Sequence, residues 1–117
     1  MSADQPTGDE LLAMLSALDS PWRIRILAAL AGRADYVSSL AREVGISRPL
    51  LHMHLKRLED AGLVVGRLEL SDDGKALKYF EVVPFVLTLR PETFVNAAET
   101  LTETGTDRSN KPKGTRS

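Results

Sequence analysis

The chain has 117 residues, of which 43% are hydrophobic, and this length suits one domain with a packed core. It contains no cysteine, which excludes disulfides, cysteine-based zinc fingers, thiol redox chemistry and cysteine nucleophiles. The net charge of −1 does not indicate a nucleic-acid binder, although such an average would hide a local basic patch. The opening MSADQPTGDE does not resemble a signal peptide, and no apolar run approaches the roughly 20 residues of a membrane span. We therefore expect a soluble cytoplasmic protein.

The first residues, 1–8, are polar, and we expect them to be flexible. A first helix is predicted over residues 9–18, because apolar residues recur there at helical spacing: Leu11, Met14, Leu15 and Leu18.

A second helix is predicted to begin after Ser20, which is a good N-cap, with Pro21 in its first turn. Ile24, Leu27 and Leu30 are expected to share its buried face, and Gly32 to stop it.

Two further helices follow with a very short turn between them. Residues 37–44 place Val37, Leu40, Ala41 and Val44 on one face, and Gly45 is a C-terminal stop. The next helix is predicted from the N-cap Ser47 to about residue 61, with Pro49 in its first turn and Gly62 closing it.

The stretch from residue 63 to residue 83 changes period and contains the turn sequence SDDG. It predicts a β-hairpin with strands at 64–70 and 77–83. A last helix is predicted over 91–104, with Phe94, Val95, Ala98 and Leu101 along one stripe. The tail 105–117 lacks apolar residues and carries four basic residues against one acidic residue, so we expect it to be disordered.

This order predicts a mainly α fold with a β-hairpin wing, a winged helix-turn-helix of five helices over residues 9–104. The helix at 47–62 is the one that would lie in a DNA major groove. At about 100° per residue, Leu51, His54, Leu55 and Leu58 point to the core side.

The opposite side of this helix supplies candidate DNA-binding residues. Guanidinium groups match guanine O6 and N7, so Arg48 and Arg57 are candidates for base reading. An amphipathic helix with a solvated charged face is the alternative. The full set of candidates, including wing cations that would meet phosphate or the minor groove, is Ser47, Arg48, Pro49, His52, Met53, Lys56, Arg57, Arg67, Lys75 and Lys78.

Electrostatics support this interpretation weakly, because residues 36–83 contain seven basic and seven acidic residues. Asp72 and Asp73 at the predicted wing tip would repel phosphate. DNA binding would therefore depend on where the charges lie and on doubling them in a dimer.

The two histidines do not predict a metal site. His52 and His54 are two residues apart on a helix, so they point about 200° away from each other and cannot chelate one ion. His54 is expected to be a hydrogen-bonded core residue. We predict no metal and no cofactor. The chain also lacks a phosphate-binding glycine loop, a GxSxG elbow and an HExxH motif, so we do not expect an enzyme.

Two segments resemble the ArsR family. ALDSPWRIRILAAL is similar to its LxDPxRxxIL signature, with Ser20 inserted before the proline. VSSLAREVGISRPLLHMHLKRLEDAGLV is similar to VxxLAxxxGxSxxxVSxHLxxLxxAGLV, and GKALKYFEV resembles the second wing strand. The resemblance covers about residues 10–104.

The resemblance implies a homodimeric, sequence-specific regulator of transcription that binds double-stranded DNA, usually as a repressor. It places the dimer interface on the first and last helices, with packing inside one chain as the alternative for each residue: Leu11, Met14, Leu15, Phe94, Val95, Ala98 and Leu101. Metal-sensing members carry a cysteine pair where this chain has SSLAREV, so we do not expect a cysteine-based metal sensor. The alternative function is a winged-helix protein–protein interaction module without specific DNA binding.

Overall fold

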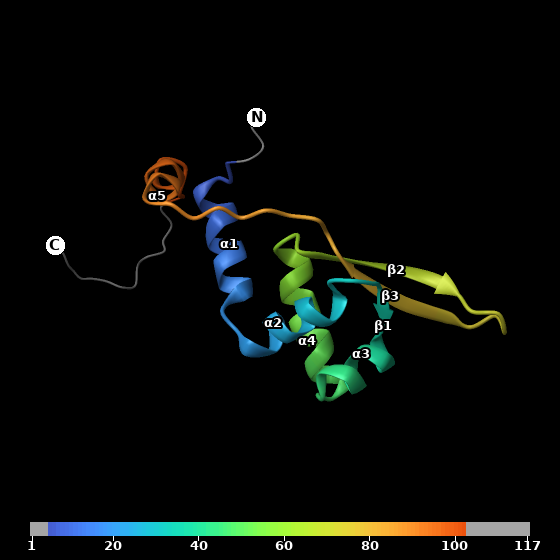
Figure 1. The fold of residues 1–117 in the computed structure, drawn as a ribbon. Helices are drawn as coiled ribbons and strands as arrows, with labels where there is room; N and C mark the ends of the chain where they lie inside the picture. The colour runs from blue at the N-terminus through green and yellow to red at the C-terminus, as the bar shows by residue number, and fades with distance from the viewer. Residues whose placement is uncertain (1–4, 103–117) are drawn as a thin grey trace. The chain divides into compact units, whose positions relative to one another are not determined.

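The computed structural model describes residues 5–102. The described residues form two compact units, one of residues 5–12 with 86–102 and the other of residues 13–85 (Figure 1). The first helix, α1 (Gly8–Leu18), has residues in both units. None of the helices formed by the described residues is both long and apolar enough to cross a bilayer.

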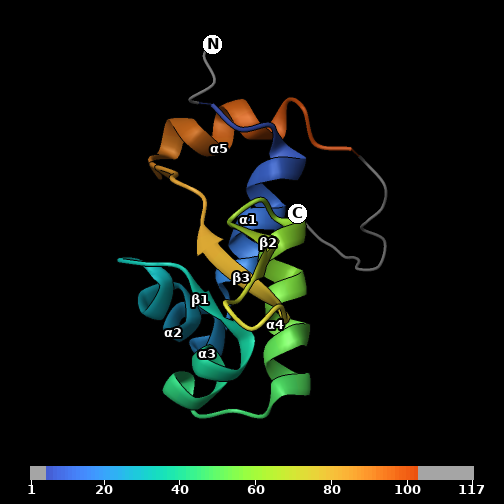
Figure 2. The same ribbon diagram turned by 90° about the vertical axis from the view of Figure 1, so that its right-hand side faces the viewer.

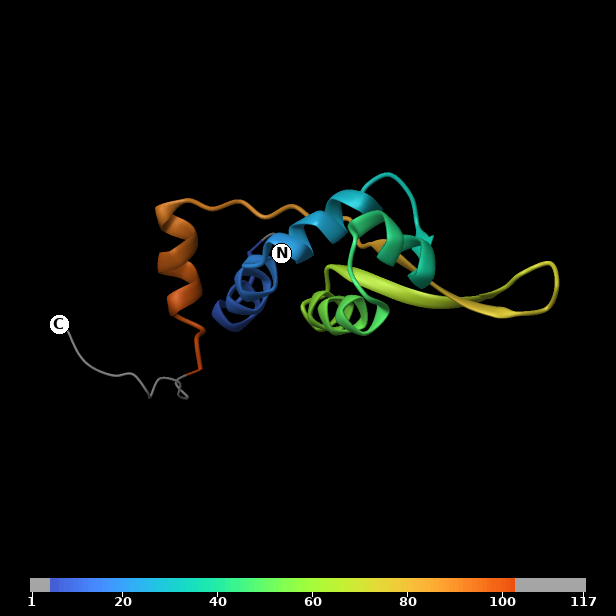
Figure 3. The same cartoon turned by 90° about the horizontal axis from the view of Figure 1, so that it is seen from below.

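The unit of residues 13–85 contains three helices and a small sheet. The helices are α2 (Pro21–Leu30), α3 (Val37–Val44) and α4 (Arg48–Asp60). The strands are β1 (Asp35–Tyr36), β2 (Val64–Leu70) and β3 (Ala76–Val82), antiparallel in the order β1-β3-β2. This arrangement is the predicted winged helix-turn-helix, and the twisted β2–β3 hairpin extends away from the helices (Figure 3).

The helix ends agree with the capping residues of the sequence. The Ser20 hydroxyl accepts a hydrogen bond from Arg23 N at 3.3 Å, and the Ser47 hydroxyl accepts one from Leu50 N at 3.3 Å. Gly45 and Gly62 follow α3 and α4 with φ of 87° and 79°, a left-handed conformation that glycine adopts without steric cost. The tight turn between α3 and α4 therefore follows from local sequence.

The core of this unit lies between the three helices and the inner face of the hairpin. Its fully buried side chains include Ile26, Leu40, Leu51, Leu55 and Leu58. Burial of one such leucine or isoleucine contributes about 1.5–3 kcal/mol to the free energy of unfolding. The predicted buried faces of α3 and α4 are confirmed.

The predicted buried face of α2 is wrong in one position. Ile24 is 55% exposed, whereas Ile26 is completely buried beside Leu30. Arg23, which is 9% exposed, lies on the same buried face of α2. Apolar periodicity does not predict a buried arginine. The predicted buried face of α2 therefore included Ile24 in place of Arg23 and Ile26.

The sheet contains a strand that the sequence did not predict. Asp35 and Tyr36 pair with Phe80 and Tyr79 of β3. This strand has two residues, too few to show an alternating pattern. The hairpin loop spans residues 71–75, one residue shorter than predicted, because Ser71 N and Lys75 O form a hydrogen bond of 2.8 Å.

The other unit contains the start of α1 and α5 (Pro91–Ala98). The predicted helix over 91–104 was too long, because α5 ends at Ala98. Beyond that end, Thr100 Oγ1 accepts a hydrogen bond of 2.8 Å from Gly8 N, and Thr102 bonds to the Asp9 carboxylate. Threonine side chains that bond elsewhere compete with continuation of a helix. The predicted tail 105–117 lies outside the described residues.

Candidate nucleic-acid interface

The surface of α4 opposite its leucines is exposed and cationic. Leu51, Leu55 and Leu58 hold the helix against the core. The predicted DNA-binding residues of this segment are all exposed on the other side: Ser47, Arg48, Pro49, His52, Met53, Lys56 and Arg57. Leu50, at 47% exposure, adds an apolar contact surface to them.

The two histidines lie in different environments, as the helical projection predicts. His52 is exposed, whereas His54 is half-buried and its Nδ1 lies 2.9 Å from Arg23 Nη1. Burial, followed by the positive charges of Arg23 and Arg57, lowers the pKa of His54. Arginine can only donate, so His54 Nδ1 is the acceptor and the ring is neutral with its proton on Nε2.

Arg57 has a partner that the sequence did not predict. Its Nη2 donates to Ser16 Oγ at 3.1 Å, near the end of α1. The Arg57 guanidinium is therefore directed toward α1, whereas a base-reading side chain would have its guanidinium free.

The structure brings three of the predicted cationic or titratable residues to one hollow between α4 and the wing. The hollow has a volume of about 250 Å³, and α4 packs against β2 beside it (Figure 2). Its lining residues are His52, Leu55, Lys56, Glu59, Lys78 and Phe80. Lys56 Nζ also pairs with Asp60 at 3.1 Å, and Lys78 Nζ lies 5.6 Å from the centre of the Phe80 ring.

The structure does not bring Arg67 to this hollow. Arg67 pairs with Tyr79 in the hairpin register, and Lys78 pairs with Leu68, so the two cations point to opposite faces of the sheet. Arg67 forms ion pairs with Glu69, at 2.7 Å, and with Glu81. The hydrogen bonds that Arg67 donates to Glu69 and Glu81 raise the pKa of Arg67, and the two carboxylates offset its positive charge.

The wing tip is negative. The side chain of Ser71 donates a hydrogen bond to Asp73, which lowers the pKa of that carboxyl and keeps it ionised. Lys75 is exposed in the same turn. The cation at Lys75 therefore has two carboxylates, Asp72 and Asp73, within three residues of it.

Two buried polar residues, Arg23 and Asp35, were not predicted from the sequence. Arg23 donates to Ala17 O at 2.6 Å and to Ser16 O at 3.4 Å, in addition to His54. Asp35, 4% exposed, accepts hydrogen bonds from Tyr36 N and Ser39 Oγ at 2.9 and 3.0 Å. Arg23 matches the arginine of the LxDPxRxxIL signature that this segment resembles, and this match was the one sequence signal that could have singled out Arg23.

The residues predicted for a dimer interface divide into two groups. Leu11 is 4% exposed and Met14 and Leu15 are half-buried, so Leu11 is a core residue of the chain itself. The residues around α5 are exposed: Phe94 at 49%, Val95 at 63% and Leu101 at 44%, together with Ala98.

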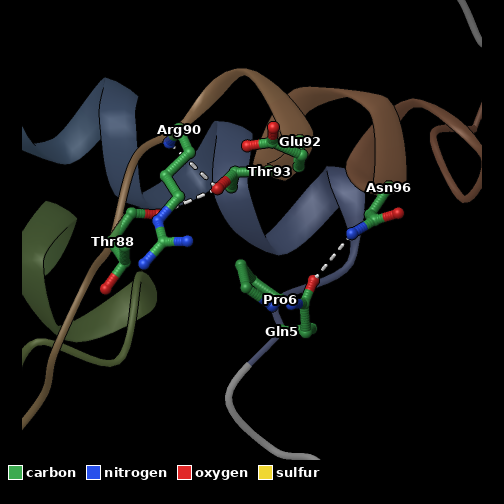
Figure 4. A pocket seen from close by; sticks show the side chains of 7 residues that line it. All are labelled: Gln5, Pro6, Thr88, Arg90, Glu92, Thr93 and Asn96. Carbon is green, nitrogen blue, oxygen red and sulfur yellow. Dashed lines mark hydrogen bonds between the residues drawn. The ribbon is translucent and has the colours of Figure 1, made fainter.

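A polar pocket of about 320 Å³ lies beside α5 (Figure 4). Its lining residues are Gln5, Pro6, Thr88, Arg90, Glu92, Thr93 and Asn96. Several of its polar groups bond to one another: Asn96 Nδ2 donates to Gln5 Oε1 at 3.2 Å, and Thr93 Oγ1 donates to Thr88 O at 3.1 Å.

Known proteins resemble this arrangement in sequence and in fold. The family model of the bacterial regulatory proteins of the arsR family matches residues 20–65. An HTH-type transcriptional regulator of Methanocaldococcus jannaschii is 39% identical over 62 residues, which are 53% of this chain and 65% of that protein. The chain thus spans slightly less than two thirds of this relative.

Solved structures share the fold. The homodimeric winged helix-turn-helix DNA-binding domain of a possible ArsR-family regulator from Mycobacterium bovis superposes with a TM-score of 0.57 at 26% identity, covering 63% of this chain and 64% of that one. HlyU from Vibrio cholerae superposes with a TM-score of 0.57 at 23% identity, covering 72% and 83% of the two chains. The transcriptional repressor BigR from Xylella fastidiosa gives 0.55 at 22% identity, covering 65% and 72%.

The tight turn between α3 and α4, the wing beside α4 and these similarities agree with one another. Residues 20–65 of this chain are similar to the helix-turn-helix segment of the arsR family, and with the wing that follows they form a winged helix-turn-helix fold.

Proposed function

We propose that the protein is a homodimeric, sequence-specific regulator of transcription that inserts α4 into the DNA major groove. The observation that carries this proposal is the hollow where His52 and Lys56 of α4 meet Lys78 of the wing. A phosphate beside the groove edge would find two ammonium groups there, while exposed Arg48 in the first turn of α4 reaches base edges.

A dimer would present two cationic α4 helices to DNA, which compensates for the low positive charge of one copy. The winged region has no net charge, so affinity depends on two cationic helices acting together. Exposed Phe94, Val95 and Leu101 would be covered by a second copy, as the homodimeric relative suggests. The operator is then a pseudo-palindrome with half-sites roughly 10 bp, or a multiple of it, between centres.

We further propose that the protein acts as a repressor in the cytoplasm, without a cysteine-based metal signal. A bound dimer covers its operator, and the relative from Xylella fastidiosa is described as a transcriptional repressor. The chain has no cysteine to ligate a soft metal.

Selection of DNA sites from a random library with the purified protein tests the proposal. Enrichment of a pseudo-palindrome is the expected result. Arg48→Ala combined with Lys56→Ala should then abolish binding to the selected site while the circular dichroism spectrum stays unchanged. Arg25→Ala combined with Arg90→Ala is the matched control, because it removes the same charge from outside α4 and the wing.

Sedimentation of the same samples measures the oligomeric state. The proposed dimer should dissociate when Phe94 and Val95 are both changed to Asp, since a charge in an apolar interface is left without a partner. A library that shows no enrichment, together with a monomer at micromolar concentration, would favour a protein–protein interaction module instead. The exposed wing residues Leu68 and Leu70, at 68% and 77%, would then be the first surface to examine.

A further inference from the structure

A chain of hydrogen bonds joins α4 to α1 and α2. Arg23 of α2 donates to Ala17 O and Ser16 O at the end of α1, and its Nη1 lies 2.9 Å from His54 Nδ1 of α4. Arg57, one turn further along α4, donates to Ser16 Oγ. The position of α4 against α1 and α2 therefore depends on polar contacts as well as on leucine packing.

We infer that His54 is a positioning residue for α4, and that it holds the helix in its DNA-binding position only while its ring is neutral. The inference rests on the proposed function for its link to DNA. Its physical basis is the contact itself: a protonated His54 carries a proton on Nδ1 and cannot accept from Arg23. Protonation would turn a hydrogen bond into a contact between two cations.

Among residues 5–102, the charged neighbours that act on His54 are both positive. From α2 it faces Arg23 and from α4 itself Arg57, and both arginines donate to neutral acceptors of Ser16 at the end of α1. Neither arginine forms an ion pair with a carboxylate among residues 5–102.

The other elements packed on α4 do not change this balance. In α3, Glu43 pairs with Arg33, and Arg42 is exposed. In β2, Arg67 pairs with Glu69. Burial and the two arginines act in the same direction and lower the pKa of His54, so the neutral ring prevails near pH 7 and protonation follows on acidification.

Protonation of His54 breaks the contact that positions α4 and weakens DNA binding. Exposed His52 lies beside the proposed phosphate site, so variants that test His54 replace His52 by Asn and leave His54 as the one histidine of the chain.

The first experiment measures the affinity for a selected DNA site between pH 7.5 and 5.5. In His52→Asn, affinity should fall on acidification by a factor in the range of about 5 to 150, the usual range of coupling between sites. In the double variant His52→Asn with His54→Asn, that fall should disappear, because the Asn oxygen takes the place of Nδ1 and accepts from Arg23 at every pH. An equal fall in both proteins would overturn the inference.

The second experiment needs no DNA. Nitrogen NMR of the wild-type imidazoles should show His54 with its proton on Nε2 at pH 7.5. The backbone amides of Ser16 and Ala17 should shift as His54 titrates, because they lie at the far end of the Arg23 contacts. The inference would be overturned if the His54 ring carried its proton on Nδ1 at pH 7.5, or if the chemical shifts of the Ser16 and Ala17 amides did not change as His54 titrates.

The two experiments separate this inference from the proposed function. If no DNA is bound at any pH, the proposed function fails, and the NMR titration still decides whether His54 positions α4. If DNA is bound and its pH dependence is the same with and without His54, the proposed function stands and the positioning role is wrong.

Discussion

Gly66 faces Phe80 directly across the wing, and the Phe80 ring occupies the space that a side chain at Gly66 would need. The two residues are partners in the β2–β3 register, and Phe80 is 3% exposed. A Cβ atom at Gly66 would come within 2.8 Å of Phe80 Cε1 and within 2.8 Å of Lys78 Cε.

Gly66→Ala should therefore destabilise the winged unit. The Phe80 ring lies in the core and cannot move without disturbing its neighbours, so we expect a loss of about 1–3 kcal/mol in the free energy of unfolding, the usual cost of overpacking. Urea denaturation measures it. Gly32→Ala is the control, because no atom lies within 4 Å of a Cβ built at Gly32. Equal denaturation midpoints for the two variants would contradict the prediction.

The two serine N-caps allow stability and DNA binding to be separated. Ser20→Ala and Ser47→Ala each remove a side-chain acceptor from a backbone N–H at 3.3 Å, and each should cost about 0.5–2 kcal/mol. Thermal melts should show similar losses. Affinity for the selected DNA site should fall in Ser47→Ala alone, because Ser47 lies at the end of α4 that we propose meets DNA. The prediction does not hold if both variants bind equally well.

The wing cations should differ in their contribution to DNA binding, although their positions in the sequence do not distinguish them. Lys78 lines the hollow beside α4, whereas Arg67 lies on the other face and pairs with Glu69 and Glu81. Lys78→Ala should reduce the slope of log affinity against log salt concentration by about 1 per site. Arg67→Ala should leave the slope almost unchanged, since its charge is already offset. Salt titrations of DNA binding measure both slopes, and a larger change for Arg67 would show that the wing contacts DNA with its other face.

Stability should fall on acidification because of His54. Its pKa in the folded protein is lowered from the ordinary value of 6.5, so between those two values the unfolded chain binds more protons than the folded chain. The free energy of unfolding is then constant with respect to this group above about pH 6.5 and decreases as the pH falls toward the lowered folded pKa.

Urea denaturation at pH 7.5 and pH 5.5 measures this effect. His54→Asn should lose less stability than wild type between the two values. A pH dependence that survives in His54→Asn would assign the effect to other groups.

The sequence by itself determined the fold and which face of α4 is exposed. Ser20, Ser47, Gly45 and Gly62 mark helix ends through local hydrogen bonds and backbone conformation, which depend on few neighbours. The leucines of α4 recur at helical spacing, so its exposed face, with Arg48 and Lys56, follows from periodicity.

Only the tertiary structure decided what each cation contacts. Arg57 and Lys56 are neighbours in sequence, yet Arg57 reaches Ser16 of α1 whereas Lys56 lines the hollow beside Lys78. Arg67 and Lys78 looked equivalent, and the hairpin register places them on opposite faces. These outcomes depend on partners distant in the chain, because a long polar side chain takes the geometry of whatever acceptor the fold brings near it.

The environment of the buried Arg23 also depends on residues distant in the chain. Its guanidinium is accommodated in the core because Ala17 O, Ser16 O and His54 Nδ1 all accept from it. Those three acceptors come from two other helices, and a buried cation is stable only where such acceptors converge. Local sequence therefore specified the helices, and their packing specified which of their polar residues are structural and which are free to bind.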